Sequence, residues 1–254
     1  MLRTLSIFLA GAALAFAFVY AVSRIFDERE LPPNIGMSEA PCAQFDRSDA
    51  RQQRYYDWAK LCEFGADNAR ILQSGTRPKV VLLGDSLTWR WQIDEPDIAK
   101  RGIPGQTSAQ LLVRFRSDVV ALRPQVVHIL VGTNDIAGND SASSPQRVTA
   151  HISSMVDLAL ANDIVPIVAT VPPARSNSWP DGVKPYPWID VLNTQIRALA
   201  EERELVLADY HAVLAGPDGR FPQELAEDEA HPNQSGYARM RPVLDQAIIR
   251  ATRD

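Results

Sequence analysis

The chain alternates between short runs of apolar residues and longer segments in which apolar residues recur every three or four positions. Four runs, at residues 79–83, 126–131, 164–171 and 205–208, have the length and composition of strands covered on both faces. Helical spacing marks four helices, through Leu111, Phe115, Val119 and Leu122; Val148, Ile152, Met155 and Ala159; Ile189, Leu192, Ile196 and Leu199; and Tyr237, Met240, Leu244 and Ile248. This alternation predicts an α/β domain with a parallel, doubly wound sheet.

Two further segments precede this pattern. Residues 27–46 carry prolines among polar residues, which favours an irregular tether. From Ser48, a suitable N-cap, an apolar stripe runs through Tyr55, Trp58, Cys62, Ala69 and Leu72 and predicts one helix packed on the main domain. We therefore divide the chain into an N-terminal segment at residues 1–26, a tether and helix at 27–76, and the main domain at 77–254.

The N-terminal segment has the features of a targeting sequence. Residues 5–22 carry no charge, follow Arg3 and precede a mixed-charge run. An apolar helix of this length nearly spans a hydrocarbon core of roughly 30 Å, which favours an uncleaved signal anchor. The alternative is a removed signal peptide, because residues 19–21 resemble a small-x-small cleavage site. Either interpretation places the rest of the chain outside the cytoplasm, attached to the membrane or secreted.

The cysteines are consistent with that location. Cys42 and Cys62 are the two cysteines of the chain, and outside the cytoplasm they can form a disulfide. The alternative is a pair of buried free thiols.

Composition and charge exclude several classes. A chain of 254 residues with 46% hydrophobic and 22% charged residues can bury a full core, which excludes disordered and disulfide-dense miniproteins. A net charge of −5 without a basic stripe argues against nucleic-acid binding. There is no Cys/His ligand set and no glycine-rich phosphate motif, so we expect no metal and no cofactor.

Residues of types that can take part in catalysis or binding follow the predicted strands. Gly84-Asp85-Ser86-Leu87 follows the first run, Gly105 follows a turn, Gly132-Thr133-Asn134-Asp135 follows the second run, and Asp228 and His231 lie near the C-terminus. Ligands of such folds bind beyond the carboxyl ends of the strands. These blocks are therefore the candidate site.

A serine hydroxyl is a weak nucleophile until a base removes its proton, so Ser86 needs a general base close to it. The four histidines are His128, His151, His211 and His231. His128 lies inside a predicted strand and is interpreted as a core residue, whereas His231 has a carboxylate, Asp228, three residues before it. That spacing lets Asp228 hold one ring nitrogen while the other faces Ser86. The alternative is that Asp228 only caps the helix that follows Pro232.

Together the four blocks resemble the GDSL esterases and lipases, also called SGNH hydrolases. The resemblance covers residues 79–240, with all blocks in order. It implies a flavodoxin-like three-layer α/β/α fold, a catalytic triad of Ser86, His231 and Asp228, and an oxyanion hole made by the backbone N–H groups of Ser86 and Gly105 and the Asn134 amide. Gly102 is the alternative donor to Gly105, and Asn134 alternatively closes a turn.

Two competing interpretations are less consistent with the residues. The order Ser, Asp, His also occurs in α/β-hydrolases, but their elbow is G-x-S-x-G and Thr88 stands at the second glycine position. Asp85 and Asp135 are a possible carboxylate pair for a metal ion, but no third ligand has suitable spacing. We expect each of these carboxylates to order its own loop by hydrogen bonds to the backbone.

The resulting expectation is a serine esterase acting on short-chain acyl esters of a small molecule, lipid or carbohydrate. An acyltransferase that moves the acyl group to a sugar or lipid hydroxyl is the alternative, because both reactions pass through the same acyl-enzyme. A non-catalytic binding module is disfavoured, since Ser86, Asn134 and His231 would then have no chemical role.

Substrate selection is expected at residues 172–188, which follow the third predicted strand. Five prolines make this a stiff surface loop. Trp179, Tyr186 and Trp188 give it aromatic faces for a sugar or aryl alcohol, or alternatively pack into the domain. No long apolar helix is available as a lid, which favours short acyl groups.

Overall fold

The computed structural model describes residues 42, 48–139, 143–176, 182 and 184–253. The chain divides into two units, Met1–Gln44 and Phe45–Asp254, and the predicted hydrolase domain lies in the second. The apolar helix expected at residues 5–22 lies outside the described residues. Within the described ranges, no helix has both the length and the apolar character needed to cross a membrane.

The centre of the second unit is a five-stranded parallel sheet with the order β2-β1-β3-β4-β5. Its strands are β1 (Val80–Gly84), β2 (Ile98–Gly102), β3 (Val126–Leu130), β4 (Val165–Ala169) and β5 (Val206–Ala208). All four predicted apolar runs form strands. The strand β2 is not predicted by the apolar pattern, because this edge strand has the sequence IAKRG and its two basic residues interrupt the pattern.

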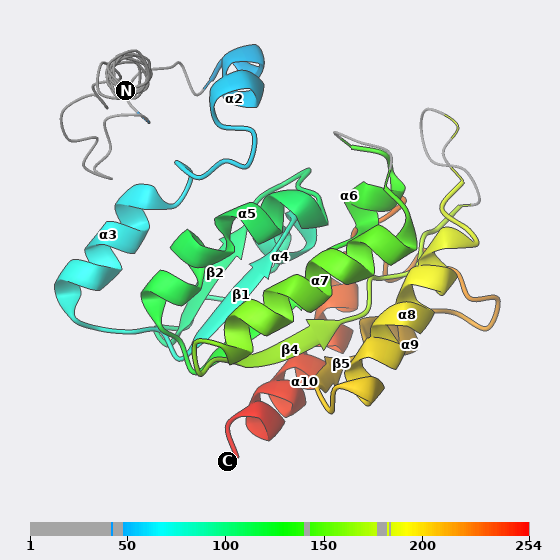
Figure 1. Ribbon diagram of the computed structural model, residues 1–254. Coiled ribbons are helices and arrows are strands. Elements are labelled where there is room, and N and C mark those ends of the chain that lie inside the picture. The colour runs from blue at the N-terminus through cyan, green and yellow to red at the C-terminus, as the bar shows by residue number, and fades with distance from the viewer. Residues whose placement is uncertain (1–41, 43–47, 140–142, 177–181, 183, 254) are drawn as a thin grey trace, which may run out of the picture. The chain divides into compact units, whose positions relative to one another are not determined.

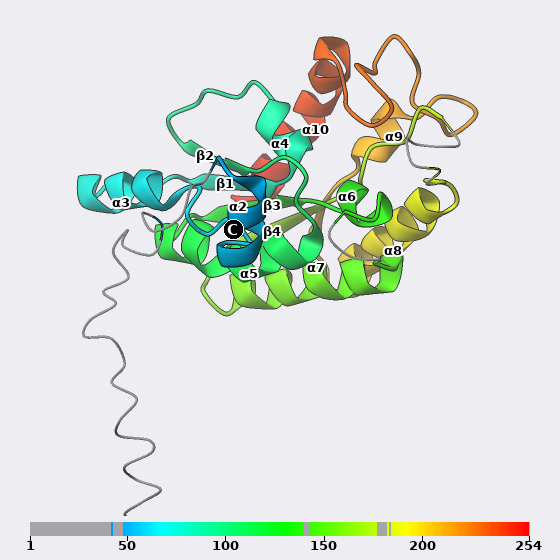
Figure 2. The same cartoon turned by 90° about the horizontal axis from the view of Figure 1, so that it is seen from above.

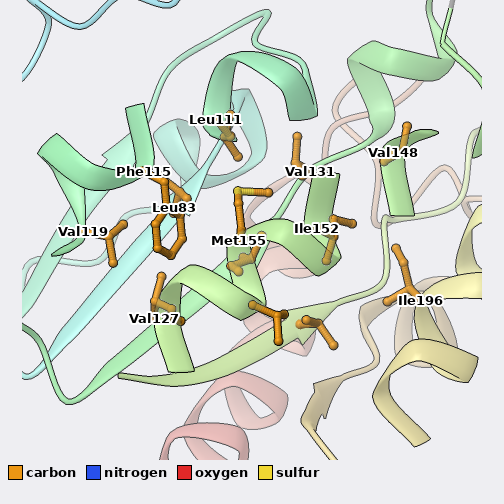
Figure 3. Close-up of a cluster of buried hydrophobic side chains, with 14 of the residues drawn as sticks. Leu83, Leu111, Phe115, Val119, Val127, Val131, Val148, Ile152, Met155 and Ile196 are labelled. Atoms are coloured by element: carbon orange, nitrogen blue, oxygen red, sulfur yellow. The ribbon is translucent and has the colours of Figure 1, made fainter. Parts of the chain in front are cut away.

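Helices cover both faces of the sheet, which confirms the three-layer α/β/α architecture (Figures 1 and 2). One layer contains α5 (Ser108–Asp118), α7 (Pro145–Leu160) and α8 (Trp188–Glu202), and the other contains α4 (Ser86–Arg90), α9 (Tyr210–Leu214) and α10 (Gln234–Ala251). The alternation along β1 explains the two cores. Leu83 packs with Phe115 and Met155 in the first (Figure 3), and Leu82 belongs to the second with Leu244.

The single helix predicted from Ser48 to Leu72 is wrong. The structure has two helices, α2 (Ala50–Tyr56) and α3 (Gly65–Ser74), with a turn between them. The Asp57 carboxylate accepts hydrogen bonds from the N–H groups of Leu61 and Cys62, and Lys60 has a φ of +54°, so the chain leaves the helical path. The expected apolar stripe is also not core, because Tyr55 is 81% exposed.

Other local features follow the sequence. Ser144 caps α7 by accepting a hydrogen bond from Arg147 N–H, and Pro145 is the first helical residue, as predicted. Thr107 and Gln110 form a capping box at the start of α5. The two cysteines of the chain, Cys42 and Cys62, are disulfide-bonded, the outcome that an extracytoplasmic location favours.

Candidate active site

The candidate site lies at the carboxyl ends of β1 and β3. Ser86 is the first residue of α4, directly after β1, and Asn134 lies in the short helix α6 (Thr133–Ile136) after β3. Gly84, the last residue of β1, has no room for a side chain, because a Cβ would lie 2.7 Å from the Leu130 carbonyl and would collide with Thr88. The glycine therefore lets α4 start against the sheet, with Ser86 at its first turn.

The structure brings Ser86, His231 and Asp228 together in a hydrogen-bonded row. The distance from His231 Nε2 to Ser86 Oγ is 2.8 Å, and that from His231 Nδ1 to Asp228 Oδ2 is also 2.8 Å. Residues 145 positions apart in the chain thus meet at one edge of the sheet. This geometry is suited to transfer of the hydroxyl proton to the imidazole while the carboxylate orients the ring.

Asp228 does more than contact the ring. Burial alone would raise its pKa, but hydrogen bonds from the Ala230 and His231 N–H groups and from the His231 ring hold the pKa below its usual value. Asp228 therefore carries a negative charge at neutral pH. The helix α10 is capped instead by Asn233, whose side chain accepts from Gly236 N–H.

Asn134 joins the loops that follow β1, β2 and β3. Its Nδ2 donates to Asp85 Oδ2 at 3.1 Å and to the Gln106 carbonyl at 3.0 Å, and its Oδ1 accepts from Asn139 at 2.9 Å. Gly105, the residue before Gln106, has a φ of +80°, which favours glycine. Asn134 and the Gly105 loop are consequently held side by side.

Gly102, the alternative donor, lies elsewhere. It is the last residue of β2 and pairs with Gly84 in the sheet. A Cβ on Gly102 would lie 2.9 Å from the Asp85 carbonyl, so this glycine allows α4 to approach β2.

Asp85 and Asp135, the acidic residues of the first and third blocks, are both buried. Burial raises the pKa of Asp85 to about 7, although Leu87 N–H and the Asn134 amide donate to its carboxylate. Burial also raises the pKa of Asp135, which accepts from the N–H and hydroxyl of Ser108. Asp135 thus fixes the start of α5 and not its own loop, which corrects the expectation. In the described ranges, no group of three or more metal-ligating side chains is placed to hold an ion.

The other histidines bond to other groups. His128 is buried in β3 with Nε2 2.9 Å from the Tyr210 hydroxyl, and burial lowers its pKa to about 3, so it is a neutral core residue as predicted. His151 Nδ1 lies 2.8 Å from Ser108 Oγ. His211 is partly buried near Asp190 and its pKa is lowered by burial.

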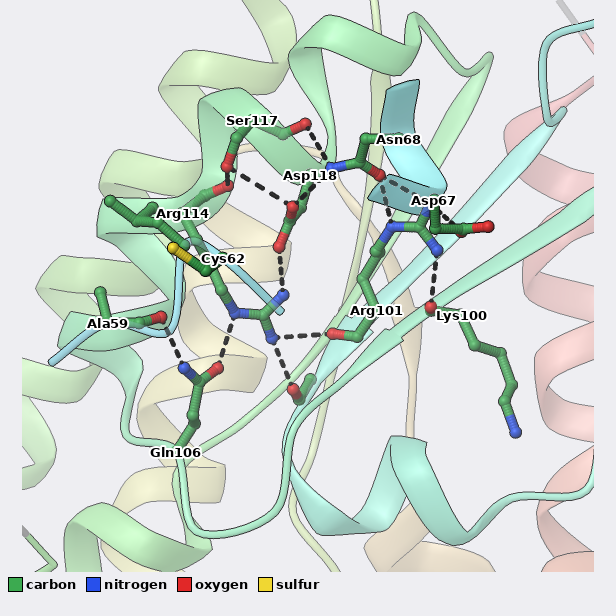
Figure 4. A network of polar contacts seen from close by, with 12 residues as sticks. Ala59, Cys62, Asp67, Asn68, Lys100, Arg101, Gln106, Arg114, Ser117 and Asp118 are labelled. Atoms are coloured by element: carbon green, nitrogen blue, oxygen red, sulfur yellow. Dashed lines mark hydrogen bonds and ion pairs between the residues drawn. The ribbon is translucent and has the colours of Figure 1, made fainter. Parts of the chain in front are cut away.

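A buried polar network that the sequence did not predict lies behind the site (Figure 4). Arg114 of α5 is fully buried; its guanidinium donates to the carbonyls of Gly84 at 2.8 Å and Arg101 at 2.7 Å, and to the Gln106 side chain at 2.6 Å. Asp118 neutralises it at 2.9 Å. Arg114 therefore ties the ends of β1 and β2 to the Gly105 loop. The sequence feature that indicates this network is Arg114 itself, an arginine on the apolar face of α5.

The aromatic residues proposed for substrate binding have different surroundings. Trp179 lies outside the described residues. Tyr186 is half-buried, and its hydroxyl accepts from Ala174 N–H at 3.1 Å and lies 3.0 Å from the Gly219 carbonyl, so it packs into the domain. Trp188 opens α8 and is 49% exposed, which leaves its ring accessible.

Ser86 thus lies at the carboxyl edge of a parallel, three-layer α/β/α domain, where ligands of such folds bind. The sequence profile of the GDSL-like lipase/acylhydrolase family matches residues 64–239. The chain belongs to this family and is an ester-hydrolysing enzyme. Comparison with curated proteins gives no significant match.

Solved structures agree with this assignment. An acylhydrolase from Bacteroides fragilis is 36% identical, with a TM-score of 0.71 over 78% of this chain and 99% of that one. A GDSL-like lipase from Bacteroides thetaiotaomicron is 33% identical, with a TM-score of 0.69 over 77% and 100% of the two chains. A variant of an acetyl-xylooligosaccharide esterase from Geobacillus shares the fold at 21% identity, with a TM-score of 0.54 over 67% and 94%.

Proposed function

We propose that the enzyme hydrolyses short-chain acyl esters with Ser86 as nucleophile, His231 as general base and Asp228 as the group that orients His231. The observation that carries the proposal is the 2.8 Å contact between His231 Nε2 and Ser86 Oγ, with Asp228 on the other ring nitrogen. Ser86 is the first residue of α4 and follows the carboxyl end of β1, where ligands of parallel α/β folds bind.

The proposed reaction has two halves. Ser86 Oγ attacks the ester carbonyl while its proton passes to His231 Nε2, and the Asp228 carboxylate stabilises the imidazolium. When the tetrahedral intermediate collapses, the C–O bond to the alcohol breaks and His231 gives the proton to the departing oxygen. Water, activated by the same histidine, then attacks the acyl-enzyme and releases the carboxylic acid and the Ser86 hydroxyl.

The proposed oxyanion hole consists of the N–H groups of Ser86 and Gly105 and the side-chain amide of Asn134. In the absence of substrate, Asn134 Nδ2 donates to Asp85 and to the Gln106 carbonyl. Binding of an oxyanion therefore requires that one of these hydrogen bonds is shared or exchanged. Catalytic hydrogen bonds commonly tighten only in complexes with substrate or in the transition state, so this is compatible with the role.

Short acyl groups on a bulky alcohol remain the proposed substrates. The proposal keeps the expectation from the sequence that no long apolar helix serves as a lid over a long acyl chain. The exposed ring of Trp188 offers a surface for a sugar or aryl group. We expect Trp179→Ala to change selectivity for the alcohol part more than for the acyl part.

The experiment is an ester series with p-nitrophenyl acetate, butyrate and laurate, with wild-type enzyme and Ser86→Ala. We expect turnover of acetate and butyrate, little turnover of laurate, and near-complete loss in the variant. Added alcohol acceptors distinguish an acyltransferase, because they would divert the acyl group into a new ester. Preference for laurate would contradict the short-chain proposal, and full activity of Ser86→Ala would contradict the mechanism.

We also propose that the hydrolase domain acts outside the cytoplasm, anchored by residues 5–22 or released after their removal. The uncharged apolar run and the disulfide-bonded cysteines support this location. Membrane fractionation with carbonate extraction tests it. A full-length chain that resists extraction indicates an anchor, a mature form that begins at Val22 indicates a cleaved signal, and a full-length chain in the cytoplasmic fraction contradicts both.

A further inference from the structure

The helix α4 carries Ser86 at its first position and has only five residues. The last four carbonyl groups of a helix have no partner within it, so other elements must hold so short a helix in place. The Tyr237 hydroxyl of α10 donates a hydrogen bond to the Leu87 carbonyl at 2.8 Å, one residue after Ser86. The ring of Tyr237 packs on Trp91, the residue that follows α4, with 5.5 Å between the ring centroids. Tyr237 therefore contacts the nucleophile segment through both its hydroxyl and its ring.

Tyr237 belongs to the same segment of the chain as the proposed base. It lies in the first turn of α10, the helix that follows the loop of His231. Gly236, the residue before Tyr237, has no room for a side chain, because a Cβ would lie 2.8 Å from the Cβ of Pro232. Pro232 directly follows His231. The start of α10 is thus packed on the loop of His231, and Tyr237 connects this segment to α4.

An ion pair makes a second connection between α4 and the loop of His231. Arg90, the last residue of α4, pairs with Glu227 at 2.8 Å across 137 positions of the chain. Glu227 directly precedes Asp228, and its N–H donates to the His231 carbonyl at 2.8 Å. The two side chains of the pair are 33% and 55% exposed, so the pair is a weak constraint by itself and adds to that of Tyr237.

We propose that Tyr237 and the Arg90–Glu227 pair are positioning residues that hold Ser86 within hydrogen-bonding distance of His231. The inference rests on the proposed function, because these residues have this task only if His231 is the base for Ser86. The contact between Ser86 and His231 joins segments that are 145 positions apart, and a single hydrogen bond does not fix the orientation of two segments. Tyr237 and the ion pair act on the orientation of Ser86 and not on the substrate, so we expect kcat to respond and KM to change little.

Tyr237→Phe tests the hydroxyl, because the variant keeps the ring. We expect kcat for p-nitrophenyl acetate to fall about three- to tenfold with KM nearly unchanged, the range that one hydrogen bond supplies. The rate at which a fluorophosphonate, a reagent for activated serines, labels Ser86 should fall by a similar factor. Tyr210→Phe is the matched control, since it removes a hydroxyl 2.9 Å from His128 in the core and leaves the ring against Trp91. The control should lower the urea midpoint of unfolding and keep the wild-type kcat and labelling rate.

An exchange of charges tests the ion pair. Arg90→Glu alone should lower kcat about two- to fivefold, and Arg90→Glu combined with Glu227→Arg should recover most of the loss. The matched control is the pair of Arg203 and Asp157, which joins the ends of α8 and α7 at 2.7 Å with side chains 29% and 63% exposed. Arg203→Glu should leave kcat at the wild-type value.

The outcomes separate the positioning role from the proposed function. Wild-type kcat and labelling rate in Tyr237→Phe, a loss confined to KM, or an equal loss of kcat in Tyr210→Phe overturns the role of Tyr237 while ester hydrolysis stands. A charge exchange that does not recover kcat overturns the role of the Arg90–Glu227 pair. If the fluorophosphonate does not label Ser86 in the wild-type enzyme, the proposed function fails and the positioning role fails with it.

Discussion

The buried carboxylate of Asp85 accepts a hydrogen bond from the side-chain amide of Asn134, with 3.1 Å between Oδ2 and Nδ2. Asp85 directly precedes Ser86, and its second oxygen accepts from Leu87 N–H at 2.9 Å. One side chain therefore caps the helix that begins with Ser86 and also holds the proposed oxyanion donor. The first and third blocks of the motif are coupled through this contact.

The raised pKa of Asp85 makes a prediction about stability. A carboxyl with a pKa raised by burial to about 7 favours the folded state at low pH, and this contribution is lost as the pH rises to about 7. Between pH 5 and pH 8, the wild-type enzyme should lose about 2–3 kcal/mol of unfolding free energy relative to Asp85→Asn. Urea unfolding of both proteins at the two pH values measures the difference. If the difference in unfolding free energy between the two proteins is the same at pH 5 and pH 8, the raised pKa of Asp85 is contradicted.

Asn134→Ala tests the proposed oxyanion hole. Because the amide would meet the charged oxygen of the intermediate and not the neutral carbonyl, kcat should fall by about 10²- to 10³-fold while KM changes little. Steady-state kinetics with p-nitrophenyl acetate separate the two constants. An effect confined to KM would place Asn134 in substrate binding.

His231 and Asp228 should differ in the size of their effects. His231→Ala removes the proposed base and should lower kcat by at least ~10⁴-fold, whereas Asp228→Asn keeps the base and should lower it less. Asp218→Asn, at an exposed carboxylate that pairs with Arg220, is a control for the loss of one carboxylate charge and should match wild type. A larger loss in Asp228→Asn than in His231→Ala would reverse the assigned roles.

Arg114 is predicted to be a stability residue that also supports the site. Arg114→Met leaves the buried carboxylate of Asp118 without its ion-pair partner, which should cost roughly 3–5 kcal/mol of unfolding free energy. Adding Asp118→Asn should recover part of the loss, because the buried charge is then removed. Chemical unfolding of the single and double variants measures both effects. A double variant less stable than the single one would contradict the pairing.

The sequence predicted most of the sheet and the proximity of the candidate site residues. The strands β1, β3, β4 and β5 are strongly apolar, and their following residues meet because parallel strands end at one edge. β2 escaped detection because Lys100 and Arg101 interrupt an edge strand, although the Arg101 side chain is buried. The break between α2 and α3 depends on hydrogen bonds of Asp57, which apolar periodicity does not encode.

The polar network around Arg114 could not be predicted from the sequence, for a related reason. The position of Arg114 on the apolar face of α5 indicates that it faces the core, but the sequence does not identify the partners that a buried guanidinium needs. Those partners, Gly84, Arg101 and Gln106, come from three separate segments and are brought together only by the completed fold.

The most direct test of the central claim is covalent labelling of the nucleophile. The enzyme is incubated with a fluorophosphonate, digested, and analysed by peptide mass spectrometry, in wild-type and His231→Ala forms. If His231 activates Ser86, the peptide that contains Ser86 should carry the phosphonyl group in stoichiometric amount in the wild-type enzyme, with loss of ester turnover, and should react far more slowly in the variant. Stoichiometric labelling of another serine together with loss of turnover, or full turnover with Ser86 modified, would contradict the account.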